Sequence, residues 1–169
     1  MQYIETNDKN HLSRLSAVEL LTTTLLLAAL LSYLRWPVFN LFSTHLLGGT
    51  GGDTNLYFWL VTTFPKNLIE RGWFETNSFY PYQHTLAWSD NFLFPSSLFY
   101  LFHQLAGFSE ITSWNILILL AQLFNGLSVF ALAKKLGANY PSSLFLGSLF
   151  ITSSYFAEHL GHPQLQFFF

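Results

Sequence analysis

A long run without formal charge, Ile111–Ala133, constrains this sequence more than any other feature. A helix needs about 20 predominantly apolar residues to cross the hydrocarbon core of a bilayer, and this run is long enough. Of the whole chain, 51% is hydrophobic and only 9% is charged, whereas soluble domains carry about 25% charged residues. We therefore predict an all-α, polytopic membrane helix bundle whose apolar surface faces lipid.

Two further segments have the composition of membrane spans. Ala17–Leu34 is apolar except for Glu19, and Asn139–Ala157 carries no formal charge. In the second segment Ser143 and Gly147 lie four residues apart. Small residues at this spacing let another helix approach closely. We expect both segments to cross the membrane, with Asn139–Ala157 as one continuous helix.

Apolar residues at helical spacing within Arg35–Asp90 predict an amphipathic helix that lies on the membrane surface. The apolar stripe consists of Tyr57, Leu60, Val61, Phe64 and Leu68. Three charged residues lie off the stripe, namely Lys66, Glu70 and Arg71. Pro65 is expected to kink or split this helix, because proline lacks the backbone N–H that a helix interior needs. A membrane-dipping loop without a function is the alternative.

The segment Asn91–Phe108 has two interpretations. It lacks formal charge, but it contains Pro95, His103 and Gln104. It is therefore either a membrane span or a re-entrant or interfacial helix. The choice decides which face of the membrane the preceding polar stretch occupies.

Basic residues in short loops favour the cytoplasmic side, so the tight loop with Lys134 and Lys135 is expected inside. If Asn91–Phe108 does not span, the N-terminus is inside and Arg35–Asp90 is outside. If it does span, both assignments reverse. Charge counting alone favours the second arrangement, because that arrangement brings three more basic residues to the inside.

A glycine-rich turn, Gly48–Gly52, leads directly to Asp53. No Lys-Ser or Lys-Thr follows it and no strand precedes it, so it does not match a phosphate-binding loop. Asp53 stands immediately before an apolar run. It is either an ordinary helix cap, which accepts backbone N–H groups, or a carboxylate base at the lipid boundary, and one residue can serve both purposes.

The run Tyr80–Asp90 is dense in aromatic and hydrogen-bonding side chains. Aromatic faces stack on sugars, while carboxylate, amide and imidazole groups bond to hydroxyls. The candidate binding residues in this run are Tyr82, His84, Trp88 and Asp90. The alternative is a belt of interfacial aromatics, with Asp90 as the cap of the next helix.

The third polar cluster is Glu158–His162, in which His159 and His162 are three residues apart. Such a pair could bind a metal ion on a helical turn, although the glutamate does not stand where a metalloprotease motif requires it. Solvated or hydrogen-bonded histidines at the membrane interface are the alternative. An acid and two histidines at the mouth of a span are nevertheless costly to keep there without a use.

Taken in chain order, these features resemble the GT-C glycosyltransferase superfamily of multispan membrane proteins. That superfamily includes the protein O-mannosyltransferases, the aminoarabinose transferase of lipid A and the oligosaccharyltransferases. The resemblance covers about Gly52 to Gln166, and the order and spacing of the motifs support it more than any single motif. The motifs are one N-terminal span, Gly52–Asp53 with an aromatic run ending in Trp59, Phe79–Tyr80–Pro81, Thr85–Asp90 and His159–Gln164.

The resemblance implies a topology. In these enzymes the first span runs outward and a large external loop follows, with jaw helices that lie on the membrane. Mapped onto this chain, the N-terminus is inside, residues 36–110 form the external loop, and Asn91–Phe108 is a jaw or re-entrant helix. Asp53, Asp90 and Glu158–His162 then share the external face of a bacterial cytoplasmic membrane.

The resemblance also implies a reaction. Its donor is a polyprenyl-phosphate-linked sugar, and an acidic residue early in the first external loop acts as base or binds a metal. Asp53 matches that position, although many family members have paired acids there and this chain has Gly52 and Thr54 beside it. Asp90 or His162 would bind the donor. Glu158 and His159 would hold a divalent cation such as Mg or Mn.

Two other functions fit the same sequence. One is a transporter or flippase of lipid-linked sugars without chemistry, and the other is a noncatalytic membrane subunit. The net charge of −2 argues against a nucleic-acid partner. Because the chain stops at Phe167–Phe169, as another apolar run begins, we expect it to be the N-terminal part of a longer protein.

Overall fold

The computed structural model describes residues 16–167 apart from positions 50, 71, 73, 77 and 89–91. Within these residues the chain is helical and contains no strand, so the predicted all-α class is confirmed. The α-helices are α1 (Ala17–Leu34), α2 (Trp36–Phe39), α3 (Asp53–Glu70), α4 (Leu93–Tyr100), α5 (Glu110–Lys135), α6 (Tyr140–Ile151) and α7 (Ser154–Glu158). Two short 3-10 helices, Thr85–Trp88 and Pro163–Leu165, and a π-helix, Leu101–Leu105, complete the elements.

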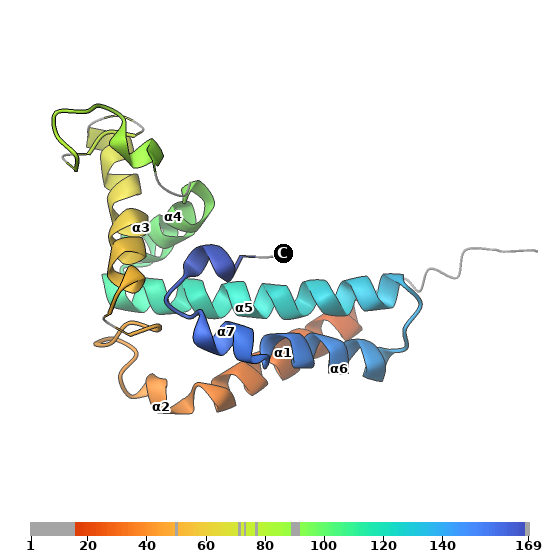
Figure 1. The fold of residues 1–169 in the computed structure, drawn as a ribbon. Coiled ribbons are helices and arrows are strands. Elements are labelled where there is room, and N and C mark those ends of the chain that lie inside the picture. Colours follow the sequence, from red (N-terminus) through yellow and green to blue (C-terminus); the bar gives the residue numbers. More distant parts are fainter. Residues whose placement is uncertain are drawn as a thin grey trace, which may run out of the picture.

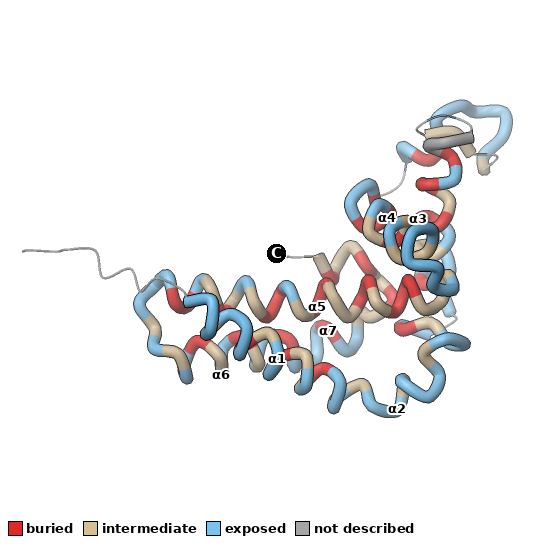
Figure 2. Tube along the Cα trace, turned by 180° about the vertical axis from the view of Figure 1, so that it is seen from behind, coloured by how far each residue is buried: buried red, intermediate tan, exposed pale blue. Residues whose placement is uncertain are grey.

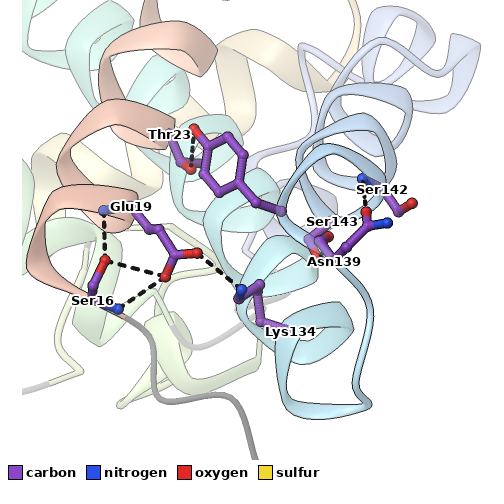
Figure 3. Close-up of polar contacts among 8 residues, drawn as sticks. Ser16, Glu19, Thr23, Lys134, Asn139, Ser142 and Ser143 are labelled. Carbon is purple, nitrogen blue, oxygen red and sulfur yellow. Dashed lines mark hydrogen bonds and ion pairs between the residues drawn. The ribbon is translucent and has the colours of Figure 1, made fainter.

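Helices α1, α5 and α6 lie alongside one another, with α5 as the longest member (Figure 1). Helix α1 runs antiparallel to α5, so the start of α1 meets the end of α5 (Figure 1). At this end Lys134 Nζ lies 2.9 Å from Glu19 Oε1, and Thr23 Oγ1 donates to the Tyr140 hydroxyl at 3.4 Å (Figure 3). These contacts join all three helices at the end opposite the Gly48–Asp53 turn.

The contact between α5 and α6 depends on two glycines. A Cβ added to Gly147 would lie 2.7 Å from the carbonyl oxygen of Gly126. A Cβ added to Gly126 would lie 2.9 Å from Ile151 Cγ2 and 3.0 Å from Leu27 Cδ1. The close approach expected at Gly147 is therefore present, and its partner surface includes α1 as well as α5.

Among the described residues, two helices are long and apolar enough to cross a membrane, α1 and α5. The most apolar windows of these helices have mean hydropathies of 1.8 and 2.2. Figure 2 shows exposed residues along α1, and they include Val18, Leu21 and Leu25. A continuous apolar surface of this kind is unusual on a soluble monomer, which favours a membrane environment.

The predicted continuous helix Asn139–Ala157 is interrupted. Helix α6 has 12 residues, about 18 Å at 1.5 Å per residue, which is short of the roughly 30 Å hydrocarbon core. The break falls at Thr152 and Ser153, where the Thr152 hydroxyl donates to the Leu149 carbonyl at 3.2 Å and Ser153 is extended. Such side-chain bonds compete with the helical pattern, an effect that hydropathy does not register.

Helices α3 and α4 pack against each other and stand steeply across α5, at the end where α5 begins (Figure 1). Helix α3 continues through Pro65 and does not split there. Three residues of its apolar stripe, Leu60, Val61 and Phe64, are buried in one cluster with Phe99 of α4 and Trp114 of α5. This part of the stripe therefore packs against protein, because α4 and the start of α5 supply apolar surface where contact with the membrane was predicted.

The segment Asn91–Phe108 contributes α4 and the π-helix, which have eight and five residues. Neither helix is long enough to cross the hydrocarbon core at 1.5 Å per residue. The described residues of this segment therefore form helices as short as a surface or re-entrant helix is expected to be.

Candidate functional site

The Gly48–Asp53 turn packs against the turn that follows α7. A Cβ added to Gly48 would lie 2.5 Å from Gly161 Cα, and one added to Gly161 would collide with the Thr54 hydroxyl. That hydroxyl donates to the Gly48 carbonyl at 3.2 Å. Gly48 also has a positive φ of 99°, which other residues rarely adopt. Glycine at both positions therefore allows two segments that are distant in sequence to touch.

A buried amide, Asn115, holds the chain that leads into this turn. Its Oδ1 accepts from the Leu47 N–H at 2.7 Å, and its Nδ2 donates to the Phe42 and His45 carbonyls, both at 2.8 Å. The Trp114 indole N–H donates to the Leu47 carbonyl at 3.0 Å. Helix α5 thus binds the backbone of the loop directly, a role that was not predicted from the sequence.

Asp53 and His162 come together at this junction. His162 Nδ1 lies 3.8 Å from Asp53 Oδ2, an ion-pair distance if the imidazole is protonated. Tyr57 lies one turn after Asp53 on the same face of α3. Its ring centroid lies 5.7 Å from that of His162, and its hydroxyl accepts from Gln164 Nε2 at 2.6 Å. Two predicted site residues therefore share one site, together with two that were not predicted.

A second buried amide network fixes the return segment after α7 over the middle of α5. Gln122 Nε2 donates to Gln166 Oε1 at 3.0 Å, and Asn125 Nδ2 donates to the Gln166 carbonyl at 2.5 Å. Gln166 Nε2 donates in turn to the His159 carbonyl at 2.7 Å. Gln122 and Asn125 could have been identified from the sequence as amides inside an otherwise apolar span, because amides without hydrogen-bond partners are costly in a bilayer.

Of the predicted metal ligands Glu158 and His159, only His159 contacts another possible ligand among the described residues, the ring of His162, with the two centroids 5.9 Å apart. His159 Nδ1 bonds to the Tyr155 carbonyl at 2.8 Å, and the two rings stack with their centroids 4.5 Å apart. Glu158 is exposed. Over the part of the chain that the structure describes, no group of three or more His, Asp and Glu side chains is arranged to hold a metal ion. A cation at this position stays a prediction.

The aromatic run lies beyond the other end of α3. Trp88 contacts the rings of Phe79 and Tyr82, with centroid separations of 5.7 and 5.6 Å. His84 Nδ1 lies 2.8 Å from Glu75 Oε1 and is largely exposed. Asp90, the fourth candidate of this run, lies outside the described residues. None of these contacts reaches Asp53 directly.

A hollow of about 710 Å³ lies between α3 and the aromatic run, and neither Asp53 nor His162 lines it. It begins on α3 one turn after Asp53, at Leu56, and ends against Phe79 and Trp88. Most of its lining is apolar, and threonine and serine hydroxyls stand on the side of the aromatic run. Its lining residues are Leu56, Trp59, Leu60, Thr76, Ser78, Phe79, Thr85, Leu86 and Trp88.

Comparisons with protein-family models, with curated proteins and with solved structures find no match for this chain. The residues that the structure describes are all-helical in their regular elements, with two helices long and apolar enough to cross a membrane and a polar junction at one end of them.

Proposed function

We propose that this chain is a membrane glycosyltransferase of the GT-C type, which moves a sugar from a polyprenyl-phosphate donor to a lipid, glycan or protein. The observation that supports this most is the meeting of Asp53 and His162. The two residues come from segments far apart in the sequence, and the resemblance implies that both lie on the external face of the membrane.

The arrangement of α1 and α5 supports the proposed orientation. Glu19, Lys134 and Lys135 lie at one end of the antiparallel pair, and the Asp53 junction lies at the other. Basic residues in short loops favour the cytoplasm. If both helices span, the junction therefore faces the outside of a bacterial cytoplasmic membrane and the N-terminus faces the inside.

The proposed reaction is an attack by an acceptor hydroxyl on the anomeric carbon of the donor sugar. Asp53, whose side chain is 58% exposed, accepts the hydroxyl proton as the new glycosidic bond forms. The bond between the anomeric carbon and the phosphate oxygen breaks, and polyprenyl phosphate leaves with the electron pair. The imidazole of His162, whose Nδ1 lies 3.8 Å from Asp53 Oδ2, donates a hydrogen bond to the departing phosphate.

Two further features support a lipid-linked sugar as the donor. The hollow that starts one turn from Asp53 is mainly apolar, so it can accept part of the polyprenyl chain while the phosphate stays near His162. At the junction, Gln164 Oε1 is buried and has no hydrogen-bond partner among the described residues. A buried acceptor without a partner costs about 1–3 kcal/mol, and a sugar hydroxyl that displaced the side chains over it would recover that free energy.

The proposal is tested with membranes that contain the chain in its natural form. Undecaprenyl-phosphate carrying ¹⁴C-labelled mannose or glucose is supplied as donor, and the same labelled sugars as nucleotide diphosphates are the control. We expect label to move into lipid, glycan or protein from the lipid-linked donor alone. Label that crosses the membrane while still attached to its carrier would support a flippase, and transfer from the nucleotide donor alone would contradict the proposal.

A further inference from the structure

Three aromatic side chains between α3 and the Thr85–Trp88 helix project from the protein. Phe79 is 68% exposed, Tyr80 is 88% exposed and Tyr82 is 65% exposed. The segment Ser78–Tyr82, here called the aromatic tip, contains no formal charge. Large rings in such a group are rarely left in water, whereas tyrosine and its aromatic neighbours favour the boundary between lipid and water.

The loop around the tip is internally held. The Thr85 hydroxyl donates to the Ser78 carbonyl at 2.8 Å, and the Trp88 ring, itself 60% exposed, contacts the rings of Phe79 and Tyr82. Phe79 itself has a φ of 63°, a conformation that costs a bulky residue about 1–3 kcal/mol. The surrounding contacts therefore hold the tip in one arrangement and leave its rings facing outward.

The position of the tip matches the depth of a membrane surface. Helix α3 stands steeply across α5 (Figure 1). Measured along the axis of α5, the loop beyond the far end of α3 therefore lies near the start of α5. If α5 crosses the bilayer along its own axis, α3 runs near the membrane plane and the tip reaches the interface well to the side of the spans. Helix α3 is 18 residues long, about 27 Å, so the tip is a distant second point of contact.

We infer that the aromatic tip inserts into the interfacial layer of the lipid bilayer and anchors the outer end of α3. The inner end of α3 is held by the junction with Gly161, and the hollow runs between the two ends. Lipid contact at the tip therefore holds in place the wall of the hollow that Phe79 and Trp88 form. The inference rests on the membrane orientation proposed above and does not depend on the transferase activity. It assigns Tyr82 to lipid, in place of the sugar predicted from the sequence.

The sequence has no cysteine, so single cysteines can report the depth of chosen positions. A nitroxide spin label is attached to Tyr80→Cys in the full chain, reconstituted in phosphatidylethanolamine–phosphatidylglycerol vesicles. Its collision rates with oxygen, which concentrates in lipid, and with a nickel chelate, which stays in water, are measured. Leu25→Cys, on the exposed face of α1, is the lipid reference, and Gln83→Cys is the reference for an exposed polar residue in the same loop.

We expect the ratio of oxygen to nickel accessibility at position 80 to lie between the ratios at positions 25 and 83. A ratio at position 80 equal to that at position 83, with position 25 in lipid, would overturn the aromatic tip anchor and leave the membrane orientation intact. Low accessibility to both reagents would also overturn it, because the tip would then be packed against protein. If position 25 reads as aqueous, the orientation and the anchor both fail.

Discussion

Replacing Asp53 with asparagine should lower the initial rate of sugar transfer by about 100- to 10,000-fold, the range that general-base catalysis contributes. Asparagine has nearly the same size and retains an oxygen that can accept hydrogen bonds at the start of α3, but it cannot take the proton of the acceptor hydroxyl. The rate is measured with the labelled lipid-linked donor. Membrane insertion of the variant is measured in parallel and should equal that of the wild type.

Glu110→Gln is the matched control for this substitution. Glu110 is also an acidic residue in the first turn of a helix, at the same end of α5, and it pairs with the exposed Lys66 at 3.0 Å. Exposed pairs contribute about 0–1 kcal/mol, so this variant should retain most of its transfer rate. Equal losses in the two variants would mean that charge near the membrane matters and that Asp53 has no special role. An unchanged rate in Asp53→Asn would remove Asp53 as the base.

Replacing Asn115 with leucine should cause the largest loss of stability. The change leaves the Leu47 N–H and the Phe42 and His45 carbonyls without their partner on α5. The Leu47 N–H is buried, and a buried group left unpaired costs about 1–3 kcal/mol; the two carbonyls are part-buried and add a smaller cost. We therefore expect a loss of about 3 kcal/mol, measured as the free energy of unfolding in mixed micelles titrated with a denaturing detergent.

Asn139→Ala provides the comparison for Asn115→Leu. Asn139 is exposed, and its side chain accepts from the Ser142 N–H at 2.9 Å as the cap of α6 (Figure 3). Loss of a cap costs about 1 kcal/mol. If Asn115→Leu were no more destabilising than Asn139→Ala, the amide would not be what holds the loop before Asp53.

Local composition predicts the two candidate spans because length and hydropathy decide them. The predicted segment Ala17–Leu34 has the same bounds as α1, and Ile111–Ala133 lies within α5. The position of Asp53 at the start of a helix also follows from local pattern, since an acidic residue next to an apolar run favours a helix start. Asp53 is the first residue of α3, and its role as a helix cap stays a prediction.

Features that depend on tertiary contacts cannot be predicted from the local sequence. The apolar stripe of α3 is indistinguishable from a lipid-facing one until α4 and α5 cover it. Ile111–Ala133 has no formal charge and therefore looks uniformly apolar in the sequence. Two amides within it nevertheless form hydrogen bonds, Asn115 with the loop before α3 and Gln122 with the segment after α7. The contact between Gly48 and Gly161 joins segments too far apart in sequence for any local pattern to pair them.

The start of α3 meets the turn after α7, and the candidate site depends on this contact. A Cβ placed on Gly161 would lie 3.4 Å from Thr54 Cβ, close to the roughly 3.5–4.5 Å that a disulfide requires. In this cysteine-free chain, the pair Thr54→Cys with Gly161→Cys should form a disulfide in the membrane under mild oxidation. Thr54→Cys with Lys135→Cys, at the far end of α5, should not. Rapid crosslinking of the first pair alone is the predicted result, and no crosslink in a correctly inserted chain would contradict the site.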